Sequence, residues 1–289
     1  LIAFPLILST GSWSIQQFVD RMFLSWYSSD ALAAAMPTGI LSFTIVSFFI
    51  GTAGYASTFV AQYTGAGRHN RVGPAMWQGI YFSLIGGIVT FIAMFFAEPI
   101  FQFIGHEESV RELETKYWRY LTIGGFFPIC MAAVSSFFNG RGKTYPVMWA
   151  SLLATCLNVI LNYLLIFGHF GLPEMGISGA GLSTVISQVF NLSLLLIMTF
   201  MGDNNAKYKT ISGWKFEKGL FLRLIRYGLP NGIHFFLDIA AFSAFILIVG
   251  RLGSAQLAAT NIALNVSMLA FMPMIGMGIT VSILVGQSL

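Results

Sequence analysis

Charge is scarce in this sequence of 289 residues, because only 9% of them are Asp, Glu, Lys or Arg. An average soluble domain carries about 25% charged residues. Hydrophobic residues make up 56% of the chain, more than a soluble core of this size can bury. The composition therefore excludes an ordinary soluble domain and indicates a protein that is solvated by the lipid bilayer.

Cysteines and the motifs of known enzymes are also rare or absent. The two cysteines, Cys130 and Cys156, lie inside apolar runs, where a lone cysteine is usually a small buried hydrophobe. The sequence contains no Walker phosphate-binding motif, no zinc-binding HExxH motif and no nucleophile elbow. We therefore expect no enzyme, no metal centre and no cofactor, and any pumping must be driven by an ion gradient or a partner.

A spaced pattern of residues near the start of the chain recurs 225 residues later. The matching residues are Pro5 with Pro230, Leu32-Ala33-Ala34 with Leu257-Ala258-Ala259, Gly51 with Gly276, and Gln62 with Gln287. The pattern is either a duplicated unit or a chance alignment of hydrophobic sequence. Duplication is typical of secondary transporters, in which one repeat moves against the other around a central site. Because the second copy stops at Leu289 and no signal peptide is visible at the start, we expect both ends to be fragment ends.

Apolar runs of about 20 residues or more, long enough to cross a bilayer as helices, fill the chain. They lie at 2–26, 34–62, 75–98, 117–138, 147–168, 178–201, 226–250 and 257–287. None alternates with a period of two, as a strand of a membrane barrel would. The sequence thus predicts an all-α integral membrane bundle of eight transmembrane helices. We expect a six-helix lobe at 1–201, a cytoplasmic linker at 202–225, and the first two helices of a second, repeat-related lobe at 226–289.

The basic residues are concentrated in alternate gaps between these runs. The gaps around 68–71, 141–143 and 207–226 hold ten of the fifteen Lys and Arg residues, whereas acidic residues dominate the gap at 107–114. Basic loops remain in the cytoplasm, so we expect a multi-pass protein of the cell (inner) membrane whose first helix starts inside. The charges are spread over several loops, which gives no reason to expect nucleic-acid binding.

Two carboxylates lie at membrane depth, Asp20 in the first run and Asp238 near the middle of the seventh. A charged residue at the centre of a membrane helix costs roughly 2.5–3.5 kcal/mol, so each is a candidate functional residue that faces a watery cavity or a partner. For Asp20 the alternative is an ion pair with Arg21. Adjacent side chains on a helix point about 100° apart, which makes that pair unfavourable.

Other polar side chains share helix faces with the two acids. Gln16 precedes Asp20 by one turn, and Asn231, His234 and Asp238 form a polar stripe in which His234 can hydrogen-bond to Asp238. We take Gln16, Asn231 and His234 as candidates for lining a substrate cavity. For His234, a hydrogen bond between helices explains the residue equally well.

Asn158 and Asn162 lie one helical turn apart in the fifth run. With Asp20 they offer amide and carboxylate oxygens, the hard ligands that suit a small cation such as Na⁺. Hydrogen bonds between helices, worth about 0.6–2 kcal/mol each, explain the two asparagines as well. The same two explanations apply to Asn261 and Asn265 in the eighth run, where hydrogen bonding between helices is favoured. We keep Asn261 as a further candidate for the substrate cavity.

Short motifs in a fixed order along the whole chain resemble the multidrug and toxic compound extrusion (MATE) family. The motifs are Val19-Asp20, Leu32-Ala33-Ala34, Gly51, Gln62, Gly65-Ala66, Asn158-Val159-Ile160-Leu161-Asn162-Tyr163, Phe167-Gly168, Gly176-Ile177-Ser178-Gly179-Ala180-Gly181 with Thr184, Gly250-Arg251-Leu252-Gly253, and Gly276-Met277-Gly278 running to Val285-Gly286-Gln287. The stretch 170–174 and the pair of asparagines are similar to the NorM-like branch of this family.

The resemblance implies twelve helices in two six-helix lobes, and export of amphipathic, often cationic compounds in exchange for Na⁺ or H⁺. Asp20 matches the acidic residue of the family's first helix. Asn158, Asn162 and Thr184 match positions near it that are proposed as a cation site, so Na⁺ would be held by Asp20 and the two asparagines. Asp238 stands where the NorM-like branch has a Glu. Some relatives carry Asp where Asn162 stands, so this sequence has one titratable group fewer there than a relay of two carboxylates needs.

The sequence therefore predicts a secondary antiporter for small organic cations, in which Asp20 alternately holds and releases Na⁺ or a proton. One alternative is a flippase for lipid-linked oligosaccharides from the same superfamily. That function would need basic residues at membrane depth, and only Arg21 qualifies. The other alternative is a membrane scaffold without transport activity, in which the two acids and the two asparagines only hold helices together.

Overall fold

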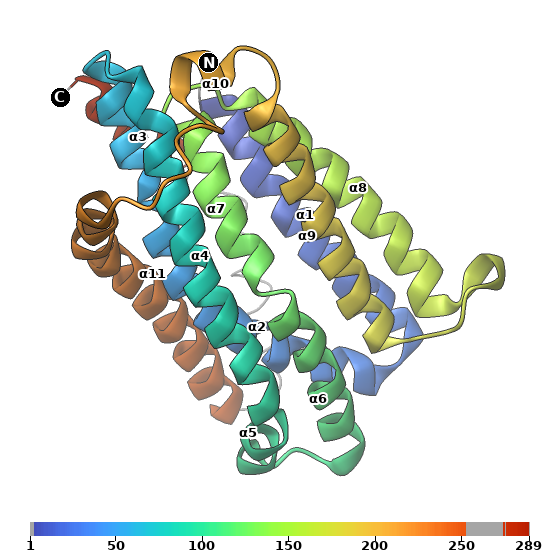
Figure 1. Cartoon of the computed structure of the whole chain (residues 1–289). Helices are drawn as coiled ribbons and strands as arrows, with labels where there is room; N and C mark the ends of the chain where they lie inside the picture. Colours follow the sequence, from blue (N-terminus) through green and yellow to red (C-terminus); the bar gives the residue numbers. More distant parts are fainter. Residues whose placement is uncertain (1–2, 253–273, 275, 289) are drawn as a thin grey trace.

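A computed structural model describes residues 3–252, 274 and 276–288 of the chain, and all regular structure in these residues is helical (Figure 1). The predicted all-α class is therefore confirmed. The helices are α1 (Ala3–Tyr27), α2 (Ser29–Gly54), α3 (Ala56–Gly65), α4 (Val72–Ala93), α5 (Ala97–Ile104), α6 (Glu108–Ile123), α7 (Phe126–Asn139), α8 (Tyr145–Phe167), α9 (Ile177–Phe200), α10 (Asn204–Tyr208) and α11 (Lys218–Leu252). A further helical segment covers Gly276–Ser288, and short 3-10 turns lie at His69–Arg71, Met94–Phe96 and His169–Gly171.

Each of the first seven predicted apolar runs overlaps a helix of the structure. Within the described residues, five helical segments are long and apolar enough to cross a membrane: Ser29–Gly65, His69–Ile104, Glu108–Asn139, Tyr145–Phe167 and Ile177–Phe200. Most of the eighth run, 257–287, lies outside the described residues, so eight transmembrane helices remain a prediction. The division into lobes also remains a prediction, although α11 already begins inside the segment predicted as the linker.

Local sequence signals explain where several helices begin and end. The side chain of Ser28 accepts a hydrogen bond of 3.2 Å from the backbone nitrogen of Asp30, which caps the start of α2. At the same end of the bundle α8 stops at Gly168, whose φ of 71° is a left-handed conformation that glycine adopts without strain. These ends fix the lengths of the helices that carry the candidate site.

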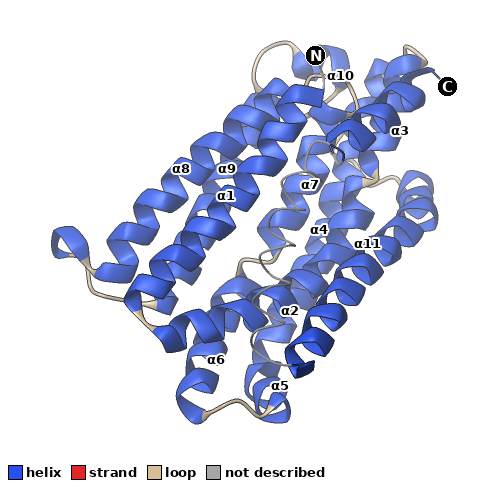
Figure 2. Ribbon diagram, turned by 180° about the vertical axis from the view of Figure 1, so that it is seen from behind, coloured by secondary structure: helices blue, strands red, loops and turns tan. Residues whose placement is uncertain are grey.

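The helices form two packed groups that meet at α2, α6 and α7. Helices α1, α8 and α9 lie side by side on one edge, and α4 and α11 lie on the other, as both views show (Figure 2). A large apolar core joins α2, α3, α4 and α7, with Phe49, Phe82 and Phe137 among its buried residues. A second core joins α1, α2, α6, α8 and α9, with Leu24, Tyr117 and Ile166 among its buried residues. This second core positions the candidate site.

Helix α11 packs against α2 through small residues that bring the two backbones into contact. A Cβ atom added to Gly51 would lie 2.9 Å from the Cα atom of Gly232, and one added to Gly232 would lie 2.1 Å from Thr52 Oγ1. The amide of Asn231 donates a hydrogen bond of 2.7 Å to the carbonyl oxygen of Gly51. Small residues commonly allow such close approach between membrane helices.

The charged loops separate to opposite ends of the bundle. The basic stretches at 68–71, 141–143 and 202–217 gather at the end where α10 lies, and the loops at 105–108 and 168–176 lie at the other end (Figure 1). At the basic end, the chain between α10 and α11 is fastened to α4, since Trp77 Nε1 donates a 2.6 Å hydrogen bond to the carbonyl oxygen of Thr210. The separation is what the charge pattern predicts, and the cytoplasmic location of the basic end stays a prediction.

Candidate functional site

Three membrane-depth helices bring a set of polar side chains together inside the bundle. Asp20 comes from α1, Asn158 and Asn162 come from α8, and Ser183 and Ser187 come from α9. On α8 and α9 the paired residues are one turn apart, so they face the same neighbour. The side chains are buried, with 5% of Asp20 and 0% of both asparagines exposed. The predicted meeting of Asp20 with the asparagine pair is present in the structure.

A continuous chain of hydrogen bonds links these side chains, which we call the Asp20 network. The amide nitrogen of Asn162 donates to Asp20 Oδ1 and, at 3.0 Å, to Asn158 Oδ1. The hydroxyl of Ser183 donates to Asn162 Oδ1, and Asn158 Nδ2 donates to Ser187 Oγ at 3.3 Å. The hydroxyl bond from Ser183 therefore turns the nitrogen of Asn162 toward the carboxylate.

The surroundings of Asp20 differ from those of a structural ion pair. No ion pair joins Asp20 to Arg21 in the described chain, so the carboxylate is held by an amide donor. One turn along the helices lie Leu24, Ile166 and Ala180, which belong to the second apolar core. A polar network enclosed by apolar side chains has a low local dielectric, which strengthens its electrostatic interactions.

The donor set fits a small hard cation or a proton. The carboxylate of Asp20, the amide oxygens of Asn158 and Asn162, and the hydroxyl of Ser183 are all oxygen ligands, which suit Na⁺ better than a soft metal ion. The same carboxylate can instead bind a proton, because a protonated Asp is both a donor and an acceptor of hydrogen bonds. The arrangement therefore allows either ion to exchange at one carboxylate.

Thr184, which the family resemblance places near this site, lies beside the network without joining it. Its hydroxyl donates a 2.9 Å hydrogen bond to the carbonyl oxygen of Ala180, on its own helix. Ser183 and Ser187 are the network members that sequence reasoning missed. Their spacing of one helical turn in an apolar run is the same signal that identified Asn158 and Asn162, and it would have identified the serines too.

On α1, the helix face that carries Asp20 continues as a polar contact with α8. Gln16 is half-buried one turn before Asp20, and Ser12 lies one turn before Gln16. The hydroxyl of Thr155 on α8 donates a 3.4 Å hydrogen bond to the carbonyl oxygen of Ser12. Gln16 therefore lies along the contact line between α1 and α8, where the predicted role in a substrate cavity remains a prediction.

The polar stripe of α11 lies apart from the Asp20 network. Asp238 Oδ2 lies 3.1 Å from His234 Nδ1, and the two side chains are 60% and 78% exposed. The expected contact between His234 and Asp238 is thus present. Asn231 hydrogen-bonds to the backbone of α2, which is a helix–helix contact. Asn261 and Asn265 lie outside the described residues.

Comparisons with known proteins agree with the motifs. The MatE family model matches residues 5–164 and 230–289. The chain is 30% identical over 293 residues to the probable multidrug resistance protein YoeA of Bacillus subtilis, covering 100% of this chain and 63% of that protein. It is 28% identical over 289 residues to the multidrug resistance protein NorM of Vibrio cholerae, covering 100% of this chain and 63% of that protein. The chain thus spans less than two thirds of the length of these curated relatives.

Solved structures share the fold. A multidrug resistance MATE family transporter of the MOP superfamily, in an outward-facing conformation, superimposes with a TM-score of 0.84 at 20% identity, covering 98% of this chain and 62% of the other. A MATE crystal structure in the straight conformation gives a TM-score of 0.86 at 21% identity, covering 98% and 63%.

The family match includes Asp20, Asn158 and Asn162, three of the residues that form the buried network. It covers well over half of the chain, and the helices are those of an integral membrane protein. The chain therefore belongs to the MatE family, the multidrug and toxic compound extrusion proteins that its sequence motifs resemble.

Proposed function

We propose that the protein to which this chain belongs is a secondary antiporter, which exports amphipathic, often cationic compounds in exchange for Na⁺ or H⁺. The observation that carries the proposal is the burial of the Asp20 carboxylate among amide and hydroxyl groups, without a basic partner in the described chain. A buried carboxylate destabilises a membrane protein, and such residues are typically found where an ion binds during transport. The multidrug resistance relatives support export of toxic compounds.

The hydrogen bonds suggest how an ion would act on the helices. The ionised carboxylate of Asp20 accepts the amide proton of Asn162. An incoming cation competes with that donor for the carboxylate, and a proton weakens the hydrogen bond because it removes the negative charge. For Na⁺, a half-turn of the Asn162 amide presents its oxygen to the ion, and the hydroxyl of Ser183 can then accept where it donated, because a hydroxyl does both. Ion binding thereby changes the contact between α1 and α8.

This change couples ion binding to helix position. With the ion bound, the hydrogen bond between α1 and α8 is weakened, so α1 can shift within its own lobe. With the ion released, the carboxylate recovers the hydrogen bond. A cationic compound that reaches Asp20 competes for the same negative charge, so drug and ion exclude each other. Antiport requires this mutual exclusion, because the protein must release the drug when it binds the ion and release the ion when it binds the drug.

The experiment is ethidium export from efflux-deficient cells that express the full-length protein, with Na⁺ and proton gradients imposed separately. We expect Asp20→Asn to lose export that depends on a gradient, because the amide binds no proton and lacks the negative charge that attracts Na⁺. Asp30→Asn is the matched control, since Asp30 is an exposed carboxylate at the start of α2. Normal export by Asp20→Asn under both gradients would contradict the coupling role.

The two alternatives predict different outcomes in the same cells. A flippase for lipid-linked oligosaccharides would export no ethidium even with the natural sequence. A membrane scaffold would also export none, and Asp20→Asn would lower only the thermal stability of the purified protein. A wild-type protein that exports ethidium while Asp20→Asn does not, at equal expression, supports the antiporter alone.

A further inference from the structure

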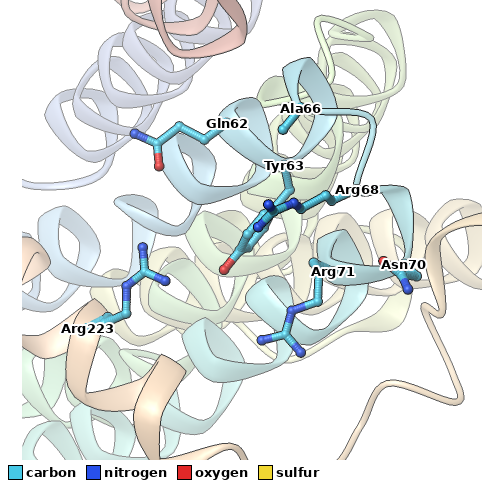
Figure 3. A pocket seen from close by; sticks show the side chains of 7 residues that line it. All are labelled: Gln62, Tyr63, Ala66, Arg68, Asn70, Arg71 and Arg223. Carbon is cyan, nitrogen blue, oxygen red and sulfur yellow. The ribbon is translucent and has the colours of Figure 1, made fainter. Parts of the chain in front are cut away.

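A pocket at the basic end of the bundle is lined by arginines from two separate segments (Figure 3). Its volume is about 710 Å³, and it lies between the turn that joins α3 to α4 and the first part of α11. The lining residues are Gln62, Tyr63, Ala66, Arg68, Asn70, Arg71 and Arg223. We call it the arginine pocket. It lies away from the Asp20 network, and its argument does not depend on the antiport proposal.

Positive charge around the arginine pocket exceeds the negative charge available to balance it. Arg71 pairs with Glu217 through two hydrogen bonds of 3.0 and 2.8 Å. Arg68 and Arg223 have no carboxylate partner in the described part of the chain, and the guanidinium of Arg223 lies 5.4 Å from the ring centre of Phe59. Two guanidinium groups are therefore open to an anion.

A smaller neighbouring pocket extends the basic surface. It has a volume of about 180 Å³, shares Asn70 and Arg71 with the arginine pocket, and adds Lys209, Lys215 and Glu217. Together the two pockets present five basic side chains and one acidic one. An excess of this size around a concave surface attracts an anion of more than one negative oxygen.

The side chains suit an oxyanion such as phosphate. A guanidinium presents its N–H groups as a planar fork that matches two phosphate oxygens at once. The amides of Gln62 and Asn70 and the hydroxyl of Tyr63 add neutral hydrogen-bonding groups around the arginines. In Figure 3 the tyrosine ring reaches into the space between Arg71 and Arg223.

The position of the pocket indicates a lipid as the source of that phosphate. The arginine pocket lies where the candidate spans Ser29–Gly65 and His69–Ile104 meet, at their shared end. Beside Lys215, the side chains of Trp214 and Phe216 are 59% and 55% exposed. Tryptophan and other aromatic residues gather at membrane interfaces, where their rings lie against lipid.

We propose that the arginine pocket binds the phosphate of an anionic phospholipid headgroup, with Arg68 and Arg223 as its main ligands. Glu217 holds Arg71 in place at the edge of the pocket. The lipid bridges the turn before α4 to the first part of α11, two segments far apart in the sequence. Basic pockets between membrane helices bind anionic headgroups in this way in other membrane proteins.

The test uses the purified protein in a neutral detergent with a fluorescent label, and measures the dissociation constant of short-chain phosphatidylglycerol. We expect Arg68→Gln with Arg223→Gln to weaken binding about 25-fold, since each interfacial charge contributes about five-fold. Lys143→Gln with Arg226→Gln is the control, because both residues are exposed at the same end and line neither pocket. The control is expected to change binding less than two-fold.

Further measurements separate the possible ligands. Arg68→Lys with Arg223→Lys keeps the charge and is expected to restore part of the affinity, which shows that the pocket variants still fold. Short-chain phosphatidylcholine should bind more weakly than phosphatidylglycerol. Unchanged phosphatidylglycerol binding in the Gln pair, or equal weakening in the control pair, would overturn the site. Displacement of the lipid by inorganic phosphate at equal concentration would overturn the lipid in favour of a soluble phosphate ligand.

Discussion

The two helices that carry the candidate carboxylates, α1 and α11, make different kinds of contact with their neighbours. Helix α1 meets α8 and α9 through side chains, and its Asp20 is buried in a chain of hydrogen bonds. Helix α11 meets α2 through the backbones of Gly51 and Gly232, and its Asp238 is 60% exposed beside His234. A contact made by side chains can respond to an ion, whereas a contact made by glycine backbones fixes where the helix lies.

This difference assigns different roles to two acids that look alike in the sequence. The carboxylate of Asp20 is part of the contact between helices, so its charge state acts on helix position. The carboxylate of Asp238 contacts His234 on its own helix. We therefore expect Asp20 to couple the ion gradient to export. The coupling role of Asp238 stays a prediction.

The largest expected effect appears when each of the two acids is neutralised in a separate variant and the export rates are compared. Asp20→Asn is expected to lower gradient-driven ethidium export at least about ten-fold, since hydrogen bonds to a charged group contribute about 1.5–3 kcal/mol. Asp238→Asn is expected to lower it less than about three-fold. Initial export rates from cells with matched expression give the comparison. Equal losses of export in the two variants would contradict the different roles that we assign to Asp20 and Asp238.

The glycine contact is tested by adding one methyl group to α11. Gly232→Ala is expected to lower the free energy of unfolding by about 1–3 kcal/mol, because its Cβ atom would overlap Thr52. Gly219→Ala on the same helix has no atom within 4 Å of the added methyl and should be neutral or slightly stabilising. Thermal unfolding of the purified protein in detergent measures both. A Gly232→Ala protein as stable as Gly219→Ala would contradict the close contact.

A smaller effect is expected from the hydroxyl that orients Asn162. Ser183→Ala removes the donor to Asn162 Oδ1 and should raise the Na⁺ or proton concentration for half-maximal export by about three- to twenty-fold, the range for hydrogen bonds between membrane helices. Ser193→Ala is the control on α9, since its exposed hydroxyl bonds only to the carbonyl oxygen of Val189. An unchanged half-maximal concentration in Ser183→Ala would show that Asn162 is oriented without this serine.

The smallest effect is expected at Thr184. Its hydroxyl bonds to its own helix, so Thr184→Val, which keeps the shape, should change ion dependence less than about two-fold. The same export assay, with the ion concentration varied, measures it. A loss as large as that of Ser183→Ala would restore the direct role in cation binding that the family resemblance implies for Thr184.

The parts of the fold that depend on local sequence could be predicted. Seven of the predicted apolar runs each overlap helical structure, and the charge pattern predicted which loops gather at each end. The spacing of Asn158 and Asn162, together with the family motifs, predicted their approach to Asp20. The role of Ser183 was not predicted, because serine is common in membrane helices and its role depends on which neighbour its helix faces.

The contact between α11 and α2 could not be predicted for a related reason. The face of α11 that meets α2 is the one on which Gly232 fits against Thr52. Such a fit is a property of two distant segments together. The arginine pocket likewise combines Arg68 and Arg223, which are far apart along the chain. The basic loops in the sequence therefore predicted the orientation of the helices but not this pocket.

The most direct test of the central claim is ion release on ethidium binding to the purified full-length protein, measured in weakly buffered detergent with proton- and Na⁺-sensitive dyes. The account predicts that ethidium releases a proton or Na⁺ from the wild-type protein and from Asp238→Asn, and that Asp20→Asn releases neither. Ion release from Asp20→Asn equal to that of the wild type would contradict the account, because the coupling ion would then be bound elsewhere.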